Sequence, residues 1–186
     1  MTAAKTKSFI AAFLGDRNVA AVSPSSPRLV RRLMRHLDLP RTKILVELGP
    51  AYGVATRPIL AALPAEARLL AVETNRGFAA ALKTVDDPRL TVIEDDARRL
   101  PAIMAERGVD AADAVIASIP FTYLSQDERR ALVAAAKKIL KPGGVFVIFH
   151  QYSLLMLPYV KKEFSQVKAE FELLNVFPCF VIEGRN

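Results

Sequence analysis

A short glycine turn is the first place in this chain where a nucleotide could bind. Residues 44–48 form an apolar run that predicts a buried strand, and Gly49 and Gly53 follow before a helix expected over 55–63. Backbone N–H groups and the positive end of a helix dipole converge at such a turn. Glycine is needed where φ is positive or where a ligand lies against the backbone. Ordinary strand-to-helix turns contain glycines as well, so the turn alone does not decide the matter.

A carboxylate stands where a nucleotide site would need one. The apolar residues 69–72 predict a second strand, which ends at Glu73. In nucleotide-binding α/β folds, an acid roughly twenty residues beyond the glycine turn accepts hydrogen bonds from two ribose hydroxyls. Glu73 is therefore the leading candidate for a ribose contact.

The composition is that of a globular protein. The chain has 186 residues, of which 52% are hydrophobic and 24% charged, so it can build a full core in one domain over 1–186. No apolar run reaches the length of a bilayer span, and the first residues lack the layout of a signal peptide. The single cysteine, Cys179, excludes an intramolecular disulfide, and His36 and His150 are too few for an obvious zinc site. We expect a cytoplasmic protein that holds no metal.

The positive charge is concentrated near the N-terminus. Of the formal net charge of +7, residues 1–36 carry +6, because they contain seven lysines and arginines against one aspartate. A basic end on a nearly neutral body is typical of a protein that binds an anionic partner, either a phospholipid surface or a nucleic acid. The alternative is an ordinary solvated helix face.

Residues 1–40 are expected to form a basic helical extension. A helix over 4–14 would place apolar side chains beside Lys5 and Lys7, as interfacial membrane helices do, but it could equally fold back as a lid. A second helix is expected after Ser26 and Pro27, with its apolar face on the core. Its arginines repeat at i, i+3, i+4 and i+7, which suits bidentate phosphate contacts. These arginines are Arg28, Arg31, Arg32 and Arg35.

Strands and helices alternate through the rest of the chain. Strands are expected at 43–48, 68–73, 89–94, 112–118 and 145–150, with helices at 55–63, 75–83, 97–106, 126–140 and 154–163. This alternation implies a parallel sheet with helices on both faces. Two further strands, 168–174 and 177–183, have no crossover helix between them and must pair antiparallel. The predicted fold is α/β, with a seven-stranded, mostly parallel sheet that ends in a C-terminal antiparallel hairpin.

Five short motifs lie at the ends of these elements. They are Glu-Leu-Gly-Pro-Ala-Tyr-Gly at 47–53, Ala-Val-Glu-Thr-Asn at 71–75, Glu-Asp-Asp-Ala at 94–97, Ala-Ser-Ile-Pro-Phe at 117–121 and Leu-Lys-Pro-Gly-Gly at 140–144. In order and spacing this set resembles the class I S-adenosylmethionine-dependent methyltransferases, which have a Rossmann-like fold. The resemblance implies an enzyme that uses S-adenosyl-L-methionine and releases S-adenosyl-L-homocysteine.

The resemblance also implies which residues hold that cofactor. Glu47 would order the loop and the methionine amino group, Glu73 would bind the ribose, and Asp96 or its neighbour Asp95 would bind the adenine amine. Ala51 and Tyr52 replace the family's usual Gly and Thr. An alanine at positive φ costs about 1 kcal/mol, and Tyr52 would project toward the methionine end. The full expected set is Glu47, Gly49, Pro50, Ala51, Tyr52, Gly53, Thr56, Glu73, Thr74, Asp95, Asp96, Ala97 and Ser118.

Two branches of this superfamily methylate amines. Residues 118–121 combine the Ser of the soluble bacterial phospholipid N-methyltransferases with the Ile-Pro-Phe of the rRNA adenine dimethylases. Segments 20–26, 149–153 and 175–181 resemble the lipid branch. The resemblance therefore implies methylation of a phosphatidylethanolamine-like head group by a protein that contacts an anionic membrane surface through residues 1–36, peripheral to the inner face of the plasma membrane. RNA adenine methylation, which is less expected, and a methyltransferase-like module without turnover are the alternatives.

Methyl transfer from a sulfonium is an in-line displacement, so the protein must position a neutral amine and exclude water. The Ser118 hydroxyl and the Ile119 carbonyl could accept amine N–H bonds, and His150 could accept a proton. Aromatic faces stabilise methylated ammonium by cation–π attraction. Each candidate has a structural alternative, as a backbone cap, a core aromatic or a satisfied histidine. The catalytic candidates are Ser118, Ile119, Tyr123, His150 and Tyr152, with Phe121 close by.

Overall fold

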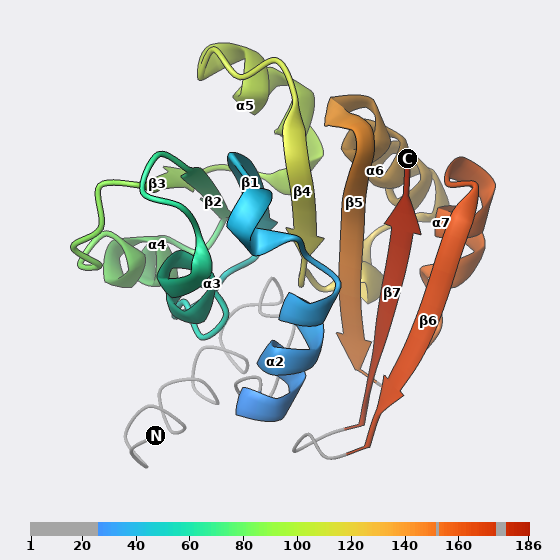
Figure 1. Ribbon diagram of the computed structural model, residues 1–186. Coiled ribbons are helices and arrows are strands. Elements are labelled where there is room, and N and C mark those ends of the chain that lie inside the picture. Colours follow the sequence, from blue (N-terminus) through green and yellow to red (C-terminus); the bar gives the residue numbers. More distant parts are fainter. Residues whose placement is uncertain (1–25, 152, 174–177) are drawn as a thin grey trace.

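A seven-stranded sheet runs through the residues that the computed structural model describes, which are 26–151, 153–173 and 178–186 (Figure 1). Its strands are β1 (Ile44–Leu48), β2 (Arg68–Glu73), β3 (Leu90–Glu94), β4 (Ala112–Ala117), β5 (Leu140–Gln151), β6 (Gln166–Glu172) and β7 (Cys179–Arg185). Their order across the sheet is β3-β2-β1-β4-β5-β7-β6. Strands β1 to β5 are parallel, whereas β7 pairs antiparallel with β5 and β6. The predicted fold class is confirmed.

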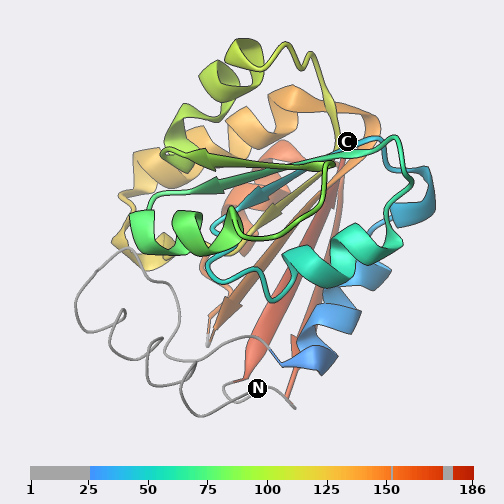
Figure 2. The same cartoon turned by 90° about the vertical axis from the view of Figure 1, so that its left-hand side faces the viewer.

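Helices cover both faces of the sheet, which Figure 2 shows nearly edge-on. One face carries α2 (Pro27–Arg35), α3 (Thr56–Ala62) and α4 (Arg76–Leu82). The other carries α5 (Leu100–Glu106), α6 (Gln126–Ile139) and α7 (Leu157–Glu163). Single 3₁₀ turns are η1 (Leu39–Arg41), η2 (Ala97–Arg99) and η3 (Phe121–Tyr123). The predicted capping box of α6 is present, with Ser125 and Glu128 exchanging hydrogen bonds.

Side chains alternate between the two faces along each strand, and this alternation determines on which face the Glu47 carboxylate lies. In β1, Val46 and Leu48 pack with α5 and α6, whereas Leu45 packs with α2 and α3. Glu47 has the same parity as Leu45. It therefore lies on the α3 side of the sheet, next to the turn that leads into that helix.

The start of β5 differs from the prediction, which placed the strand at 145–150. Leu140 already pairs with Ala112, and the register then shifts before Val145 pairs with Ala114. This irregularity accommodates Gly143, whose φ is +77°. The Pro-Gly-Gly sequence therefore interrupts the register without ending the strand.

The C-terminal hairpin was predicted at 168–174 and 177–183, but its strands cover 166–172 and 179–185. The pairing reaches Gln166 and Arg185 at the open end of the hairpin. Gly184 fits there because a Cβ atom on it would lie 2.7 Å from the ring of Phe164. The register is thus fixed by a tertiary contact that the sequence pattern does not reveal.

Helix α2 is the part of the basic extension that the structure describes, and the expected helix 4–14 lies outside it. The Leu29 N–H donates to the Ser26 hydroxyl at 3.2 Å, and Pro27 follows in the first turn. The face that carries Leu29, Val30 and Leu33 is buried. None of the helices in the described ranges has the length and apolar character needed to cross a bilayer.

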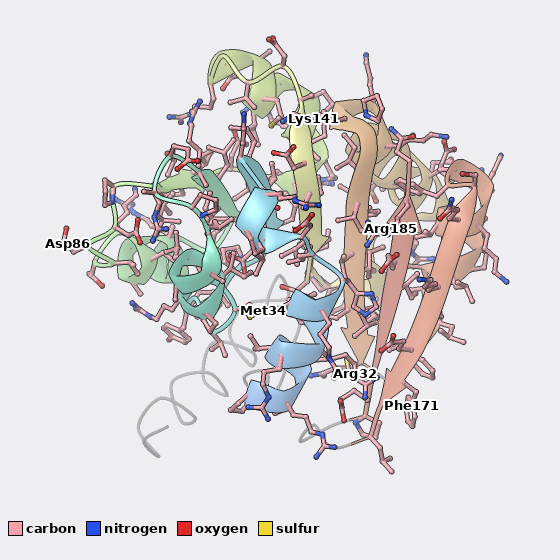
Figure 3. All side chains as sticks on the ribbon, viewed as in Figure 1. Arg32, Met34, Asp86, Lys141, Phe171 and Arg185 are labelled. Carbon is pink, nitrogen blue, oxygen red and sulfur yellow. The ribbon has the colours of Figure 1, made fainter. Side chains whose placement is uncertain are left out.

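The arginine stripe of α2 does not act as one surface. Arg32 extends toward the hairpin (Figure 3), where its Nε and Nη1 atoms lie 2.7 Å from the carboxylates of Glu172 and Glu170. Arg28 lies 3.9 Å from Glu172, whereas Arg31 is exposed. One member of the stripe therefore ties α2 to β6 and is not available to a phosphate.

Candidate active site

A pocket opens at the sheet edge where the parallel strands end, which is where α/β sheets bind their ligands. Its lining comes from the turns that follow β1, β2, β3 and β4, from the ends of β5 and β7, and from α2. In the strand order of the sheet, the pocket therefore crosses from β3 to β7. The pocket therefore extends well beyond the glycine turn after β1.

The glycine turn has the strained geometry that its sequence predicts. Gly49 and Gly53 have φ values of +74° and +75°, and Ala51 has a φ of +50°. A Cβ atom on Gly49 would lie 2.9 Å from the side chain of Ile119 and 3.1 Å from the carbonyl oxygen of Ser118. Gly49 is therefore needed both for its conformation and for its close approach to the end of β4. Ala51 is the one non-glycine residue at positive φ in the described ranges.

Glu47 is a buried acid in the pocket lining. Its side chain accepts a hydrogen bond from the Thr56 hydroxyl at 2.7 Å, and the residue is 2% exposed. The pKa of Glu47 is raised to about 7, mainly by burial and in part by the nearby Glu73 carboxylate, whereas the Thr56 hydrogen bond opposes the shift. No lysine or arginine of the described ranges forms an ion pair with Glu47. A cation that entered the pocket would therefore find a partner there.

Glu73 joins the loops that follow β1 and β2. Its carboxylate accepts the Ala51 N–H at 2.9 Å and the Asn75 N–H at 2.8 Å. The residue is buried at the end of β2 and lines the pocket, as does its neighbour Thr74. A carboxylate in this place is able to accept hydrogen bonds from the hydroxyl groups of a ligand.

The two aspartates after β3 also line the pocket, with Ala97 beside them. Asp96 accepts the Arg98 N–H at 2.8 Å, and its other oxygen pairs with the Arg98 guanidinium, which holds the pKa of Asp96 below its usual value. The same guanidinium lies 2.6 Å from Glu128 at the start of α6. Asp95 pairs with Arg99 at 2.5 Å. Both candidates are therefore near the expected adenine position, and each is held in place by an arginine.

Three predicted cofactor residues lie outside the lining. The Tyr52 ring packs edge-on against Phe78, with 4.5 Å between the ring centroids, rather than projecting into the pocket. Gly53 makes room for α4, because a Cβ atom there would lie 2.8 Å from Leu82. Thr56 is buried and orients Glu47. These residues support the site, whereas Gly49, Pro50 and Ala51 border the pocket.

Ser118 and Ile119 stand at the centre of the pocket, after β4. The Ser118 hydroxyl donates to the Gly49 carbonyl at 2.7 Å, which is the backbone-capping role considered for it. Its oxygen keeps acceptor capacity. The Ile119 carbonyl accepts the Phe121 N–H at 2.9 Å and has a second lone pair. Both oxygen atoms are therefore able to accept a hydrogen bond from an amine.

His150 lines the pocket from the end of β5 and is half-buried. Its Nδ1 lies 3.3 Å from the Ser153 carbonyl, which can only accept, so Nδ1 carries the proton and Nε2 is the acceptor. Burial lowers the pKa of His150, and the charge of Arg129 lowers it further. The imidazole is therefore neutral near pH 7 and able to take a proton.

The aromatic candidates occupy different environments. Tyr123 borders the pocket and is 59% exposed, whereas Phe121 is fully buried in the core and contacts His150 edge-on. Tyr152 lies outside the described residues. Sequence reasoning missed Phe149, which lines the pocket instead. The alternation along β5 could have revealed it, because Phe149 has the parity of the buried Val147.

Two other missed lining residues are Leu29 of α2 and Cys179 of β7, and Gln151 joins them from the end of β5. Cys179 is buried, and burial raises the pKa of its thiol to about 12, so the thiol stays protonated and unreactive. Leu29, Phe149 and Cys179 give this end of the pocket an apolar wall. Phe149 and Cys179 lie in segments 149–153 and 175–181, which resemble the lipid branch, whereas Leu29 lies in no such segment.

The charge of the lining is strongly unbalanced. Among the residues that the structure describes, one guanidinium, that of Arg98, lines the pocket, and it is already paired with two acids. The acids that line the pocket are Glu47, Glu73, Asp95, Asp96 and Glu128. Asp95, Asp96 and Glu128 are paired with arginines, and the acids that remain favour a cationic ligand. Within the described ranges, no group of three or more side chains is arranged to hold a metal ion.

Residues 45–144 match the family model for the methyltransferase domain. The chain belongs to this methyltransferase family. The match contains the glycine turn, strands β1 to β4 and the start of β5. Together with the motifs at the strand ends, it identifies an S-adenosylmethionine-dependent methyltransferase.

Relatives of this methyltransferase act on different substrates. The chain is 28% identical over 163 residues to ornithine lipid N-methyltransferase of Singulisphaera acidiphila, which covers 87% of this chain and 85% of that protein. It is 36% identical over 110 residues to ribosomal RNA small subunit methyltransferase A of Alcanivorax borkumensis, which covers 59% of this chain but 34% of that protein. The solved N-methyltransferase NodS of Bradyrhizobium japonicum has the same fold, with a TM-score of 0.71, 15% identity and coverage of 86% and 94%.

The pocket of this methyltransferase fits its cofactor, S-adenosylmethionine. Glu47 is a buried acid without a cationic partner in the described ranges, which suits a ligand that carries an ammonium and a sulfonium. Gly49 leaves the backbone open where a side chain would clash. Glu73 and Asp96 are placed to accept hydrogen bonds farther along the pocket.

Proposed function

We propose that this methyltransferase transfers methyl groups to the amine of a membrane-lipid head group. The observation that carries the proposal is the lining of five acids around one paired guanidinium. An amine that is protonated in water is attracted to such a cavity. The similarity to an ornithine lipid N-methyltransferase over most of both chains supports the same class of substrate. A phosphatidylethanolamine-like head group belongs to this class.

In this proposal the pocket has a cofactor side and a substrate side. Glu47, Glu73 and Asp96 hold the cofactor between β1 and β3. The substrate enters beside Leu29, Phe149 and Cys179, whose apolar wall accommodates the aliphatic part of a lipid head group. Ser118 and Ile119 lie between the two sides, where the methyl group must cross.

The residues between the two sides would prepare the amine. S-adenosylmethionine supplies a methyl group on a sulfonium, and transfer forms a C–N bond as the C–S bond breaks. His150 Nε2 takes a proton from the ammonium, so that the nitrogen presents its lone pair. The Ser118 oxygen accepts one of the remaining N–H bonds and fixes the direction of attack. The pocket walls keep water away from the reaction.

The membrane contact through residues 1–36 stays a prediction, since residues 1–25 lie outside the described ranges. Within α2, Arg32 is held by the hairpin, so Arg28, Arg31 and Arg35 are the arginines left for an anionic surface. RNA adenine methylation is the second candidate, because the rRNA methyltransferase is 36% identical over the segment it shares. Family membership favours both enzymes over a module without turnover.

A substrate panel tests the proposal directly. The purified protein is incubated with S-adenosylmethionine and with ornithine lipid, phosphatidylethanolamine or small-subunit rRNA, each in detergent micelles or buffer. Mass spectrometry should find added methyl groups on a lipid amine and none on RNA. Methylated adenine in the RNA sample, without any methylated lipid, would replace the lipid proposal by the RNA one.

A further inference from the structure

Four large apolar side chains are exposed in the described ranges, and all four come from segments that leave the sheet at one edge. They are Tyr123, Leu154, Phe171 and Leu173, with exposed fractions of 59%, 39%, 48% and 63%. Tyr123 follows β4, Leu154 follows β5, and Phe171 and Leu173 stand at the end of β6. Because β6 and β5 are both antiparallel to β7, β6 ends at the same edge as β5. The pocket opens at this edge.

These four side chains, here called the apolar rim, extend along the edge of the sheet. Strands lie about 4.8 Å apart, so the three steps from β4 to β6 span roughly 14 Å. The ring of Phe171 packs against that of Phe180 of β7 in a tilted arrangement, with 4.8 Å between the ring centroids. Tyr123 belongs both to the rim and to the pocket lining. The rim and the pocket mouth are therefore continuous.

Exposed guanidinium groups lie at the same end of the sheet as the rim, on the opposite face from Phe171. The Arg28 side chain is 57% exposed and lies 3.9 Å from Glu172, the residue between Phe171 and Leu173. Arg31 is exposed one turn farther along α2. Cations and exposed apolar side chains at the same end of a protein complement an anionic bilayer, with the charges at the phosphates and the apolar groups among the acyl chains. Soluble surfaces seldom leave such a patch without a partner.

We propose that the apolar rim docks this protein on an anionic phospholipid surface, with the end of β6 inserted deepest. The inference rests on the proposed function, since a lipid amine must reach the pocket from the bilayer. It assigns the contact to η3, the segment after β5 and the end of the hairpin strand β6, apart from any contact made by residues 1–25. A head group that enters past Tyr123 would not have to leave the membrane interface.

The sequence offers a clean probe of this contact, because it contains no tryptophan. Leu173→Trp places one at the rim, and Gln166→Trp places one at an exposed position at the other end of β6. With phosphatidylcholine vesicles that contain phosphatidylglycerol, emission from position 173 should shift to the blue and be quenched by brominated acyl chains. Emission from position 166 should not change.

Two results would overturn the docking surface. One is equal behaviour of the two tryptophans with vesicles. The other is a shift at position 173 that follows protein concentration without vesicles, because that would identify a contact between copies of the chain.

Removing the rim tests the same idea without a probe. Phe171→Ser combined with Leu173→Ser should weaken vesicle binding on the order of tenfold, because two large apolar groups no longer leave water. Arg28→Gln should weaken binding to anionic vesicles and leave neutral ones unaffected. Arg107→Gln is the matched control, since Arg107 is exposed after α5, near the start of β4 and the opposite edge. Cofactor affinity should be unchanged in all of these variants, and unchanged vesicle binding by the double variant would refute the rim.

The two proposals can fail separately. Methylation of a lipid amine in detergent micelles does not need vesicle docking, so it tests the substrate alone. Lipid methylation without a shift at position 173 would remove the docking surface and keep the substrate. A shift at position 173 with no lipid methylated in any form would remove the substrate and keep the membrane contact.

Discussion

Two of the acids that we propose as cofactor ligands are held in contrasting ways. Glu73 is oriented by two backbone N–H groups, those of Ala51 and Asn75. Glu47 has one hydroxyl partner, Thr56, and a pKa near neutrality because it is buried. Glu73 therefore acts as a fixed acceptor, whereas the charge of Glu47 depends on pH.

Cofactor binding should strengthen as the pH rises toward neutrality. Burial raises the pKa of Glu47 to about 7, so the acid is neutral below that pH and cannot pair with an ammonium group. Affinity for S-adenosylhomocysteine should fall by up to about tenfold for each pH unit below 7. Calorimetric titration across this range measures the effect, and Glu47→Gln should remove the pH dependence.

The same raised pKa affects folding with a defined sign. Between pH 4.5, the ordinary value, and about 7, the native state keeps a proton that the unfolded chain has lost. The contribution of Glu47 to stability therefore declines as the pH rises through this window. A pH-independent difference between the wild type and Glu47→Gln in urea unfolding would contradict this assignment.

The strained alanine in the glycine turn should be improvable. Ala51 has a φ of +50°, which glycine adopts without a steric penalty. Ala51→Gly should raise the free energy of unfolding by up to about 1 kcal/mol, reduced by the greater entropy of the unfolded chain. Ala134→Gly, at an exposed position inside α6, is the matched control and should lower it by about 1 kcal/mol. Equal destabilisation by both substitutions in urea unfolding would show that the turn is not strained.

His150 should affect turnover more than binding. If Nε2 takes the amine proton, His150→Ala lowers kcat by roughly a hundredfold or more and leaves cofactor affinity unchanged. Because burial lowers the pKa of His150, the wild-type rate should decline only at a pH below the ordinary titration range of histidine. A variant with an unchanged kcat would return His150 to a structural role.

At the scale of elements, α2 and the β6–β7 hairpin depend on each other. Arg32 bridges Glu170 and Glu172, and His36, after the end of α2, lies 2.5 Å from the buried Glu183 of β7. This network fixes the helix that carries Leu29 into the pocket lining. The position of Leu29 in the pocket lining therefore depends on the contact between α2 and the β6–β7 hairpin, which lie far apart in the sequence.

Breaking that contact should be costly. Arg32→Ala would remove the 2.7 Å ion pair of the Glu172 carboxylate, whose side chain is 3% exposed. The free energy of unfolding should fall by about 3 kcal/mol. Arg31→Ala, on the exposed side of the same helix, should change it by less than about 0.5 kcal/mol. Urea unfolding of both variants checks the difference, and equal small losses would show that the bridge is dispensable.

At the scale of the whole molecule, the sequence predicted features that depend on a few neighbouring residues, but not contacts between distant segments. Glu47 and Glu73 could be found because each stands in or at the end of a strand whose pattern is visible in a few residues. Arg32 and Glu172 are 140 residues apart, so their pairing could not be inferred from either segment. Leu29 was predicted to be in the core, and it does pack there, but its place in the pocket depends on how α2 crosses the sheet. The contact between Tyr52, in the turn after β1, and Phe78 of α4 could not be inferred either, because it joins two separate segments.

Cofactor binding should stabilise the protein as a unit, because the pocket draws on nearly every strand end. S-adenosylhomocysteine at a hundredfold excess over its Kd should add about 2.7 kcal/mol, which corresponds to a rise in Tm of roughly 5–10 °C for a chain of this size. Glu73→Ala should abolish the rise in a thermal-shift measurement. A normal rise in that variant would mean that Glu73 is not a cofactor ligand.

The residues that line the pocket come partly from the segment that matches the family model and partly from the segments on either side of it. The segment shared with the methyltransferase family, 45–144, contains the acids that line the pocket and that we propose as cofactor ligands. Leu29 precedes that segment, and Phe149 and Cys179 follow it. Descendants of one ancestor could therefore retain the donor machinery while rebuilding the two flanks to accept new molecules. A chimera designed to change the substrate should therefore exchange the segments before residue 45 and after residue 144 together, because α2 and the β6–β7 hairpin contact each other.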